Sequence, residues 1–141
     1  MDFLTTFRII GSGLSAQRKK MDAVTANIAN ISTTSTPEGG PYRRQKIAFA
    51  AEPLEKGFDS SLAQAVNAVR AEPAADARED FKRIYDPAHP DADGEGFVTF
   101  PNVNLLEEMT EMITAGRAYE ANATAFDAMK NMALKAMDIG K

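Results

Sequence analysis

Residues 104–138 read NLLEEMTEMITAGRAYEANATAFDAMKNMALKAMD, and this stretch decides the fold. Apolar or small residues recur in it at steps of three and four, which is the stripe of an amphipathic helix. Asn104 followed by Glu107 predicts a capping-box start, and Gly140 predicts the stop. Such a helix is about 50 Å long, so its stripe needs a partner of matching length. The stripe consists of Leu105, Met109, Met112, Gly116, Tyr119, Ala123 and Phe126, and Met129 or Lys130, Ala133 and Met137 continue it.

The N-terminal stretch supplies that partner. Its apolar residues also follow steps of four and three, which is the pattern of a coiled-coil seam with one polar position, Gln17. Residues 1–33 carry four basic and two acidic side chains, and residues 100–141 carry four basic and six acidic ones. We therefore expect helices near residues 3–31 and 102–138 to pack antiparallel, with a small charge bias that favours their register. The seam consists of Phe3, Phe7, Ile10, Leu14, Gln17, Met21, Val24, Ile28 and Ile31.

Composition argues against several classes of protein. The chain has 141 residues, a formal net charge of -4, no Trp and no Cys. The acidic balance argues against a nucleic-acid binder, and the absence of Cys removes disulfides, thiolate nucleophiles and Cys-based metal sites. Because no apolar run reaches about 18 residues, we expect no membrane span. The first residues also lack the basic and apolar regions of a cleaved signal peptide.

Residues 34–99 separate the two helical segments and read as an extended, weakly β insertion. Turn-forming residues from Ser32 onwards end the first helix near Asn30. We therefore predict a mainly α chain. Its helical core is discontinuous, formed by residues 1–33 and 100–141, and the insertion between them is hairpin-like.

Short strands and loops are predicted inside this insertion. Residues 52–70 are ambiguous between a helix, which Phe58, Leu62, Val66 and Val69 would suit, and an edge strand over residues 66–71. The predicted strands are residues 42–49, 81–85 and 97–100. The predicted loops are residues 71–79, which are rich in Ala, Pro and acidic residues, and the turn-rich residues 86–94.

Motifs along nearly the whole chain resemble one family. The first of them resembles the N-terminal signature of bacterial flagellar axial proteins, which form rod, hook and hook-associated segments. The others together resemble the proximal-rod proteins of the flagellar basal body within that family. The motifs are MDAVTANIAN (21–30), PYRRQ (41–45), YDPAHPDAD (85–93), GFV (96–98), PNVN (101–104), EM (108–109) and RAYEAN (117–122).

This resemblance implies a structural subunit without catalytic activity, cofactor or metal. It implies helical polymerisation into the rod that crosses the periplasm, with the terminal helices in the inner layer of the axial tube. The implied partners are further copies of the chain, other proximal and distal rod proteins, and proteins at the junction between the rod and the MS ring. It also implies export by the flagellar type III route without cleavage. The positions assigned to helix packing and assembly are Phe7, Ile10, Leu14, Met21, Val24, Asn27, Ile28, Asn30, Leu105, Met109, Met112, Gly116, Tyr119, Ala123 and Phe126.

Two positions in the first motif, Asn27 and Asn30, have two interpretations. Each can be a surface or C-cap residue of the first helix, since Asn is common at helix ends. Alternatively, their amides form hydrogen bonds that fix the helix end against its neighbours, as the family signature suggests. The sequence leaves both interpretations open.

A cluster of ionisable residues raises the question of a metal site. His89, Asp91, Asp93 and Glu95 lie within seven residues, but they lack the spacing of a calcium loop. We expect instead a rigid turn whose carboxylates cap backbone amides. The basic run at residues 43–46 is expected to be a solvated face or a subunit contact, because aromatic stacking partners are absent.

Two other function classes are weighed against the rod subunit. A soluble helical adaptor or export chaperone would use the same seams to hold a stable two-chain bundle. An enzyme would require a nucleophile, a base and an orienting group, and the sequence offers no such constellation.

Overall fold

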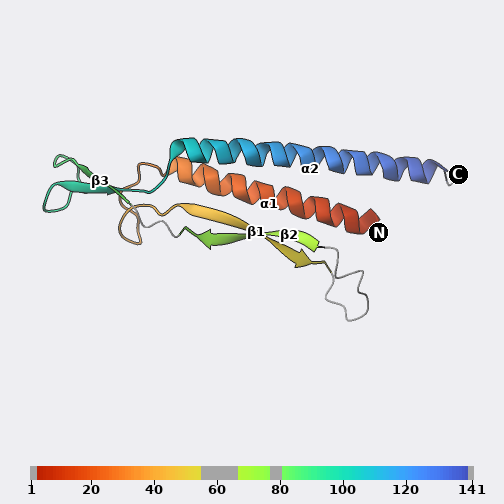
Figure 1. Ribbon diagram of the computed structural model, residues 1–141, viewed down its shortest axis with the longest axis horizontal. Helices are drawn as coiled ribbons and strands as arrows, with labels where there is room; N and C mark the ends of the chain where they lie inside the picture. The colour runs from red at the N-terminus through yellow and green to blue at the C-terminus, as the bar shows by residue number, and fades with distance from the viewer. Residues whose placement is uncertain (1–2, 55–66, 77–80, 140–141) are drawn as a thin grey trace.

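The computed structural model describes residues 3–54, 67–76 and 81–139. Its long helix α1 packs between helix α2 on one side and the β1–β2 hairpin on the other (Figure 1). A second hairpin, β3–β4, extends past the end of the helix pair where α1 ends and α2 begins. The elements are α1 (Phe3–Ala29), β1 (Gln45–Pro53), β2 (Asn67–Ala75), β3 (Lys82–Tyr85), β4 (Phe97–Phe100) and α2 (Leu105–Ile139).

The two helices are antiparallel, which confirms the predicted pair. Near one end the rings of Phe7 and Phe126 meet edge to face at 5.1 Å. Near the other end the Asn27 amide bonds the carboxylate of Glu108. Residues later in α1 therefore contact residues earlier in α2. Because α2 has 35 residues and α1 has 27, the last turns of α2 extend beyond the N-terminus of α1 (Figure 1).

Side-chain amides fix the ends of both helices. Asn104 Oδ1 accepts the N–H of Leu106 at 3.0 Å, so Asn104 is the N-cap of α2, as predicted. At the end of α1, Asn30 donates from its amide to the carbonyl of Ala26 at 2.9 Å. Asn30 therefore closes the last turn of α1, whereas the seam residue Ile31 lies just beyond the helix. The predicted stop of α2 at Gly140 lies outside the described residues.

The β1–β2 hairpin is a two-stranded antiparallel ribbon in which Phe49 lies opposite Ala71. Its second strand corrects the predicted loop at residues 71–79, because residues 71–75 belong to β2. Pro73, which has no N–H, fits opposite Ile47 because the backbone N–H at this position would point away from β1. Val69, four residues earlier, has the same orientation, and its N–H donates to Ser12 Oγ of α1 at 3.0 Å. The composition of these residues alone predicted a loop, because the strand depends on pairing with β1 and on its contact with α1.

The ambiguous residues 52–70 are partly settled. Residues 67–70 form the start of β2, so the edge-strand interpretation is confirmed there. Phe58, Leu62 and Val66, on which the helix interpretation depended, lie outside the described residues.

The β3–β4 arm, defined as residues 81–100, confirms the predicted second and third strands. Its strands pair with Tyr85 opposite Phe97, and the two rings meet edge to face at 5.3 Å. Gly96 has a φ of 82°, and a Cβ built there would lie 2.9 Å from the Tyr85 ring. Glycine is required because an L side chain would be both strained and in contact with the ring.

The interior of the described chain is small. The buried apolar side chains are short, so little of the large apolar surface is removed from water within one chain. They are Ala16, Ala23, Val24, Ala71, Val98, Val103 and Ala115.

Candidate assembly surface and buried polar junction

A cluster of buried and partly buried polar groups joins α1, α2 and the β1–β2 hairpin, and we call it the polar junction. Its centre is Glu108, which lies in the first turns of α2 and is 0% exposed. A carboxylate near a helix N-terminus is favoured by the orientation of the peptide dipoles. The members of the polar junction are Asn27, Tyr42, Arg44, Gln45, Asp76, Glu108 and Glu111.

Arg44 is the cation of the polar junction. Its Nε donates to Glu108 Oε1 at 2.6 Å, its Nη1 to Asp76 Oδ2 at 3.1 Å, and its Nη2 to Glu111 Oε1 at 3.3 Å. The Arg44 side chain is 3% exposed. One guanidinium from the approach to β1 thus holds two carboxylates of α2 and a carboxylate that follows β2.

Asn27 uses all of its hydrogen-bonding capacity in the polar junction. Its Nδ2 donates to Gln45 O at 2.8 Å and to Glu108 Oε2 at 3.0 Å. Its Oδ1 accepts Gln45 N–H at 2.8 Å and Tyr42 O–H at 3.0 Å. An amide has two donors and two acceptor positions, so all four are satisfied without water. Asn27 therefore satisfies the backbone N–H and C=O of Gln45, the first residue of β1, on the edge that faces away from β2.

These contacts shift the pKa values of two members of the polar junction. Burial would by itself lower the pKa of Arg44, but hydrogen bonds to Glu108 and Asp76 and the negative charges of Glu108 and Glu111 outweigh burial and raise it. Burial, with a smaller contribution from the Glu108 carboxylate, raises the pKa of the Tyr42 hydroxyl above its ordinary value of 10.0. Arg44 is therefore charged and Tyr42 neutral at physiological pH.

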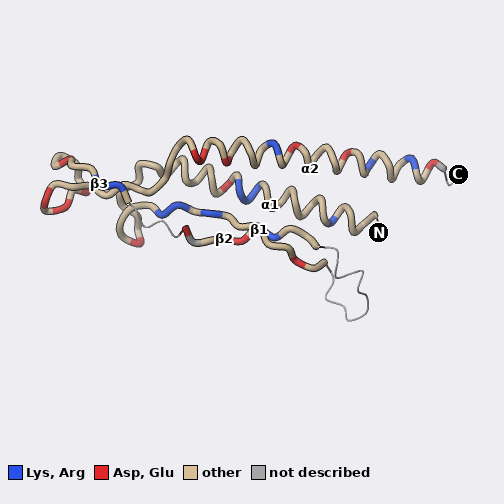
Figure 2. The backbone as a smooth tube through the Cα atoms, viewed as in Figure 1, with Lys and Arg blue, Asp and Glu red and all other residues tan. Residues whose placement is uncertain are grey.

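A partly exposed ion pair extends the polar junction along α1. Lys20 Nζ lies 3.4 Å from Glu111 Oε2 and 5.9 Å from the ring centroid of Phe49. Lys20 therefore touches α2 and β1 from its place on α1. Figure 2 shows the basic residues of α1 and β1 on neighbouring segments.

The structure decides between the two interpretations of the Asn pair, and it gives each residue a different role. Asn27 forms hydrogen bonds that fix the helix to other segments of the same chain, whereas Asn30 is a helix-end residue. The expectation for the basic run is wrong at Arg44, which is buried, while Arg43 and Lys46 are exposed as expected. The physical reason is that Glu108, far away in sequence, provides a buried counter-charge.

Sequence reasoning missed the pairing of Arg44 with Glu108. The local pattern gave no signal for it, because Asn27 and Glu108 lie outside the predicted seam and stripe. Arg44 belongs to the insertion, so its pairing with Glu108 depends on how the insertion folds back.

The predicted stripe of α2 lies to one side of its contact with α1. At 100° per residue, the stripe is rotated by about 70° from the line through Glu108, Ala115 and Asn122, which faces α1. Leu105 and Met109 are accordingly 46% and 49% exposed, whereas Phe126 at the edge of the stripe still reaches Phe7. Gly116 and Ala123 make the middle of the stripe shallow, and both are partly buried.

The predicted seam of α1 is better covered within the chain. Val24 is buried, and the other members between Phe7 and Ile28 are partly buried, whereas Phe3 at the N-terminal end is exposed. Helix α1 is covered on two sides, by α2 and by the hairpin, which explains the difference from α2. The partly buried members are Phe7, Ile10, Leu14, Gln17, Met21 and Ile28.

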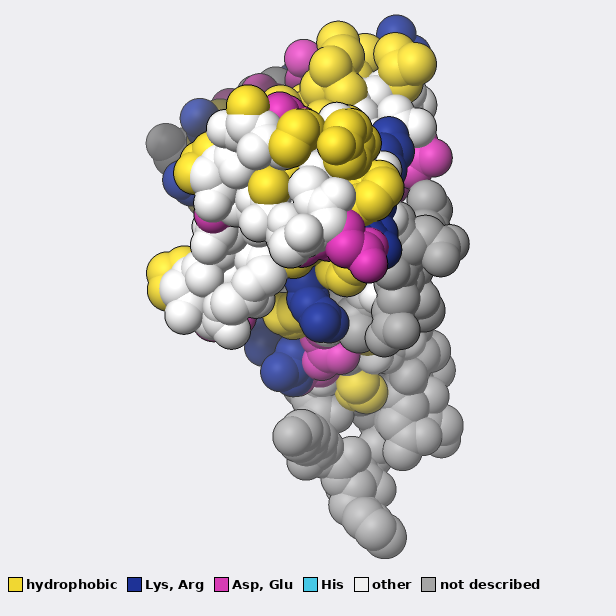
Figure 3. Space-filling model, turned by 90° about the vertical axis from the view of Figure 1, so that its left-hand side faces the viewer, with side chains coloured by type: hydrophobic (Ala, Val, Ile, Leu, Met, Phe, Trp, Pro, Cys, Tyr) yellow, Lys and Arg dark blue, Asp and Glu magenta, His cyan; other side chains and the backbone are white. Residues whose placement is uncertain are grey.

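Large apolar side chains also lie exposed outside the stripe. Leu106 and Ile113 are 75% and 56% exposed on the outer face of α2. Ile84 and Tyr85 are exposed on the β3–β4 arm, and apolar side chains are visible on this end of the molecule in Figure 3. Met137 is exposed on the overhanging end of α2.

Carboxylates in the turn at residues 86–96 accept hydrogen bonds from backbone amides. Asp93 Oδ1 accepts the N–H groups of Glu95 and Phe97, both at 2.9 Å, and its Oδ2 accepts Arg83 Nη2 at 2.7 Å. The Phe97 N–H is the main reason that the pKa of Asp93 lies below its ordinary value of 3.8. This confirms that carboxylates of the loop cap backbone amides. Within the described ranges, no group of three or more His, Asp or Glu side chains is placed to hold a metal ion.

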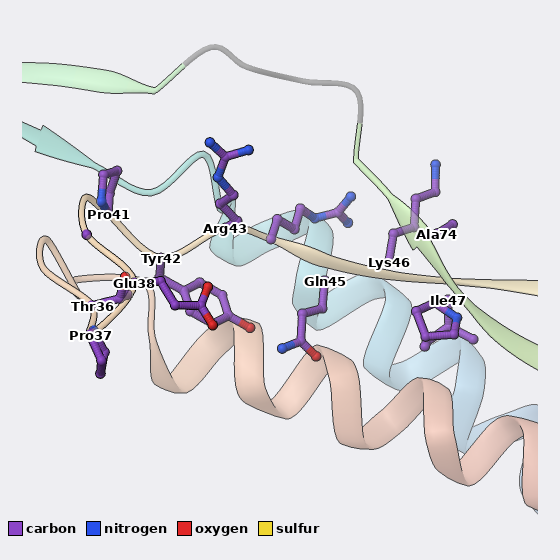
Figure 4. A pocket seen from close by; sticks show the side chains of 13 residues that line it. Thr36, Pro37, Glu38, Pro41, Tyr42, Arg43, Gln45, Lys46, Ile47 and Ala74 are labelled. Carbon is purple, nitrogen blue, oxygen red and sulfur yellow. The ribbon is translucent and has the colours of Figure 1, made fainter.

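An open groove of about 590 Å³ lies beside the polar junction, between the turn at residues 36–41, the start of β1 and the end of β2. In Figure 4 the side chains of Arg43 and Lys46 point away from α1, whereas Gln45 points toward it. The groove is therefore lined by proline, tyrosine and exposed basic groups.

Neither helix of the described ranges has the length and apolar character that crossing a membrane requires.

Comparison with known proteins identifies the family. The family described as "Flagella basal body rod protein" matches residues 7–35, and the one described as "Flagellar basal body rod FlgEFG protein C-terminal" matches residues 95–139. These two ranges contain most of α1 and all of β4 and α2.

Full-length relatives are more specific. The chain is 43% identical to flagellar basal-body rod protein FlgC of Borreliella burgdorferi, with 99% of this chain and 98% of that protein covered. It is 38% identical to FlgC of Bacillus subtilis, covering 96% and 97%, and 33% identical to FlgC of Salmonella typhimurium, covering 100% of each. Identity at this level over the whole length shows that the chain belongs to the flagellar basal-body rod protein FlgC family, and that it is a structural subunit of the rod rather than an enzyme.

Proposed function

We propose that this subunit polymerises helically into the axial rod by packing the stripe of α2 against neighbouring subunits. The proposed neighbours are further copies of the chain, other proximal and distal rod proteins, and the proteins that join the rod to the MS ring. In this proposal, the helical core formed by residues 1–33 and 100–141 builds the wall of the axial channel. Residues 34–99 form the insertion outside it.

The observation that carries the proposal is the amount of surface that the single chain leaves exposed. Its accessible surface is 10014 Å², whereas a compact monomer of 15.3 kDa would expose roughly 7,100 Å². Most of the large apolar side chains that are exposed in the described chain lie on α2. Apolar surface of this extent marks sites where other protein chains pack.

The shape of the stripe supports helix-to-helix packing with a neighbour. Leu105 and Met109 at one end and Tyr119 near the middle are substantially exposed. Between them Gly116 offers a shallow position, and Ala123 offers a second one beyond Tyr119. Small residues between large ones let another helix approach closely while the large side chains interlock with it.

The remaining assigned positions contribute to assembly indirectly, through contacts within their own chain. Phe7, Ile10 and Leu14 support the stripe from α1, and Met21, Val24 and Ile28 do the same nearer the polar junction. Asn27 and Asn30 fix the end of α1, so their proposed contribution to assembly is to hold the helix pair in a shape that neighbours can fit. We also propose export by the flagellar type III route without cleavage of the chain.

Site-specific photocrosslinking tests the proposal. A small diazirine-bearing amino acid is placed at Met109 in the stripe, and a matched variant carries it at Thr124, an exposed position of α2 outside the stripe. In purified basal bodies, we expect Met109 to give products with a second copy or another rod protein, and at a higher yield than Thr124. Assembled rods in which Met109 gives no interchain product would contradict the stripe as an interface.

A further inference from the structure

We propose that the β3–β4 arm is a docking surface for the opposite end of the next subunit along the rod. We call that end the helix-end surface, and in this chain it consists of residues 3–8 of α1 and 130–138 of α2. The occupant of the arm is this end of a neighbouring rod subunit, which presents exposed apolar and basic side chains. The inference rests on the proposed helical polymerisation, and it adds a contact that the stripe of α2 does not make.

The first argument is the place of the two surfaces in the molecule. The arm extends past the point where α1 ends and α2 begins, whereas the helix-end surface lies where α1 begins and α2 ends (Figure 1). Surfaces at opposite ends of one elongated chain can meet only between separate subunits. Such head-to-tail contacts continue from one subunit to the next without closing, which builds a helical assembly.

The second argument is the exposure of β3. All four of its residues are exposed, and the side chains of Ile84 and Tyr85 are 49% and 64% exposed. A two-stranded hairpin is only marginally stable by itself in water, and burial of large apolar side chains stabilises it. A partner chain on this strand would therefore stabilise the arm. Tyr85 would be its central contact, because tyrosine is enriched among the residues that dominate interfaces.

The third argument is that side chains of the arm already hold this surface in shape. The Tyr85 ring meets the Phe97 ring edge to face, and Arg83 Cζ lies 4.9 Å from the centroid of the Phe97 ring. Arg83 Nη2 also bonds Asp93 Oδ2 at 2.7 Å, which ties β3 to the turn. Docking loses less conformational freedom when the contacting side chains are fixed beforehand.

The fourth argument is that the helix-end surface has complementary chemistry. Its Leu4, Met132 and Met137 side chains are 70%, 52% and 63% exposed. The arm has two basic and four acidic side chains, and the helix-end surface has three basic and one acidic, so their formal charges are -2 and +2. Acidic residues gather at the end of the arm in Figure 2. Apolar contact would supply the affinity, and the opposite charges would orient the two ends.

Photocrosslinking in purified basal bodies tests the inference. p-Benzoylphenylalanine replaces Tyr85, which keeps an aromatic ring beside Phe97, and a matched variant carries it at the exposed Ala48 of the β1–β2 hairpin. Each variant is expressed beside the parent chain, so that basal bodies form in every case. From position 85 we expect products whose second peptide, mapped by mass spectrometry, comes from the helix-end surface of another rod subunit. From position 48 we expect no such products.

A substitution measures what the contact contributes. We expect Tyr85→Ser, expressed without the parent chain, to lower the yield of basal bodies with a complete rod by about tenfold or more. Lys82→Ser is the matched control at another exposed residue of β3, and it should leave the yield unchanged. Because Tyr85→Ser also loses the contact with the Phe97 ring, the crosslinked peptides decide whether the lost contact lies between subunits.

Three outcomes would overturn the inference. One is a set of products from position 85 that map to a surface other than the helix ends, such as the stripe of a neighbouring α2. Another is an unchanged yield of complete rods in Tyr85→Ser. The third is the absence of products from position 85 in basal bodies where Met109 gives its interchain products. That third result would leave the proposed function standing, whereas products from position 85 without products from Met109 would contradict the stripe instead.

Discussion

The two asparagines of the Asn-Ile-Ala-Asn motif should contribute very differently to stability. Replacing Asn27 by Ala removes four hydrogen bonds at 2.8 to 3.0 Å, so partly buried groups of Gln45 and Tyr42 and a buried oxygen of Glu108 lose a partner. A typical hydrogen bond contributes about 0.5–1.5 kcal/mol, and an unsatisfied buried partner costs more. We expect Asn27→Ala to lower the free energy of unfolding by about 3–5 kcal/mol.

The matched variant is Asn30→Ala. Asn30 is partly buried, and its amide closes one helix turn and meets Thr33 Oγ1 at 3.2 Å. Loss of such a capping interaction costs about 1 kcal/mol. Because a chain of this size is stabilised by roughly 7–20 kcal/mol, only the Asn27 change should remove a large part of the total.

Urea unfolding followed by circular dichroism measures the difference. With a slope of about 2 kcal/mol/M, the midpoint should fall by roughly 2 M for Asn27→Ala and by roughly 0.5 M for Asn30→Ala. Asn27→Asp should be no better than Asn27→Ala, because a carboxylate cannot donate to Gln45 O and would repel Glu108. Equal midpoints for the two alanine variants would refute the four-bond account of Asn27.

Three further outcomes are expected. Ala123→Glu should abolish rod assembly and motility without preventing export, because overpacking costs about 1–3 kcal/mol in every subunit, while Glu120→Gln at an exposed position outside the stripe should leave cells motile. Gly96→Ala should destabilise the β3–β4 arm by more than 1 kcal/mol, since φ is 82° there, whereas Gly94→Ala meets no atom within 4 Å and should be mild; thermal unfolding compares the two. Since the folded pKa of Tyr42 is raised, the stability linked to its hydroxyl is fully present below pH 10 and is lost as pH rises through the folded value. Unfolding between about pH 9 and 11 should therefore show a decline that Tyr42→Phe lacks.

The helices show how much local pattern predicts. Apolar residues at steps of three and four, without interrupting proline, predicted both helices to within a few residues of their ends, and Asn104 predicted the start of α2. Matching lengths also predicted that the helices pair. These properties depend on neighbours one or two turns away, so sequence contains them directly.

The site was less predictable than the helices. The exposed stripe of α2 was recognised, but the sequence did not reveal which side of the helix faces α1. On the side that faces α1, Glu108 is buried beside Arg44, and Arg44 comes from a distant segment of the chain. The hairpin partner of β1 was likewise missed at residues 71–75, because Ala and Pro have weak strand preferences and pairing outweighs them.

By itself the sequence determined two long amphipathic helices, a β insertion between them and an apolar stripe too long for one small chain to cover. Only the tertiary structure decided how these parts fit together. The reason is physical: helical periodicity is a property of consecutive residues, whereas compensation of a buried charge requires groups that are distant in sequence. Asn27, Arg44 and Glu108 come from three separate segments, and their arrangement exists only once the chain has folded.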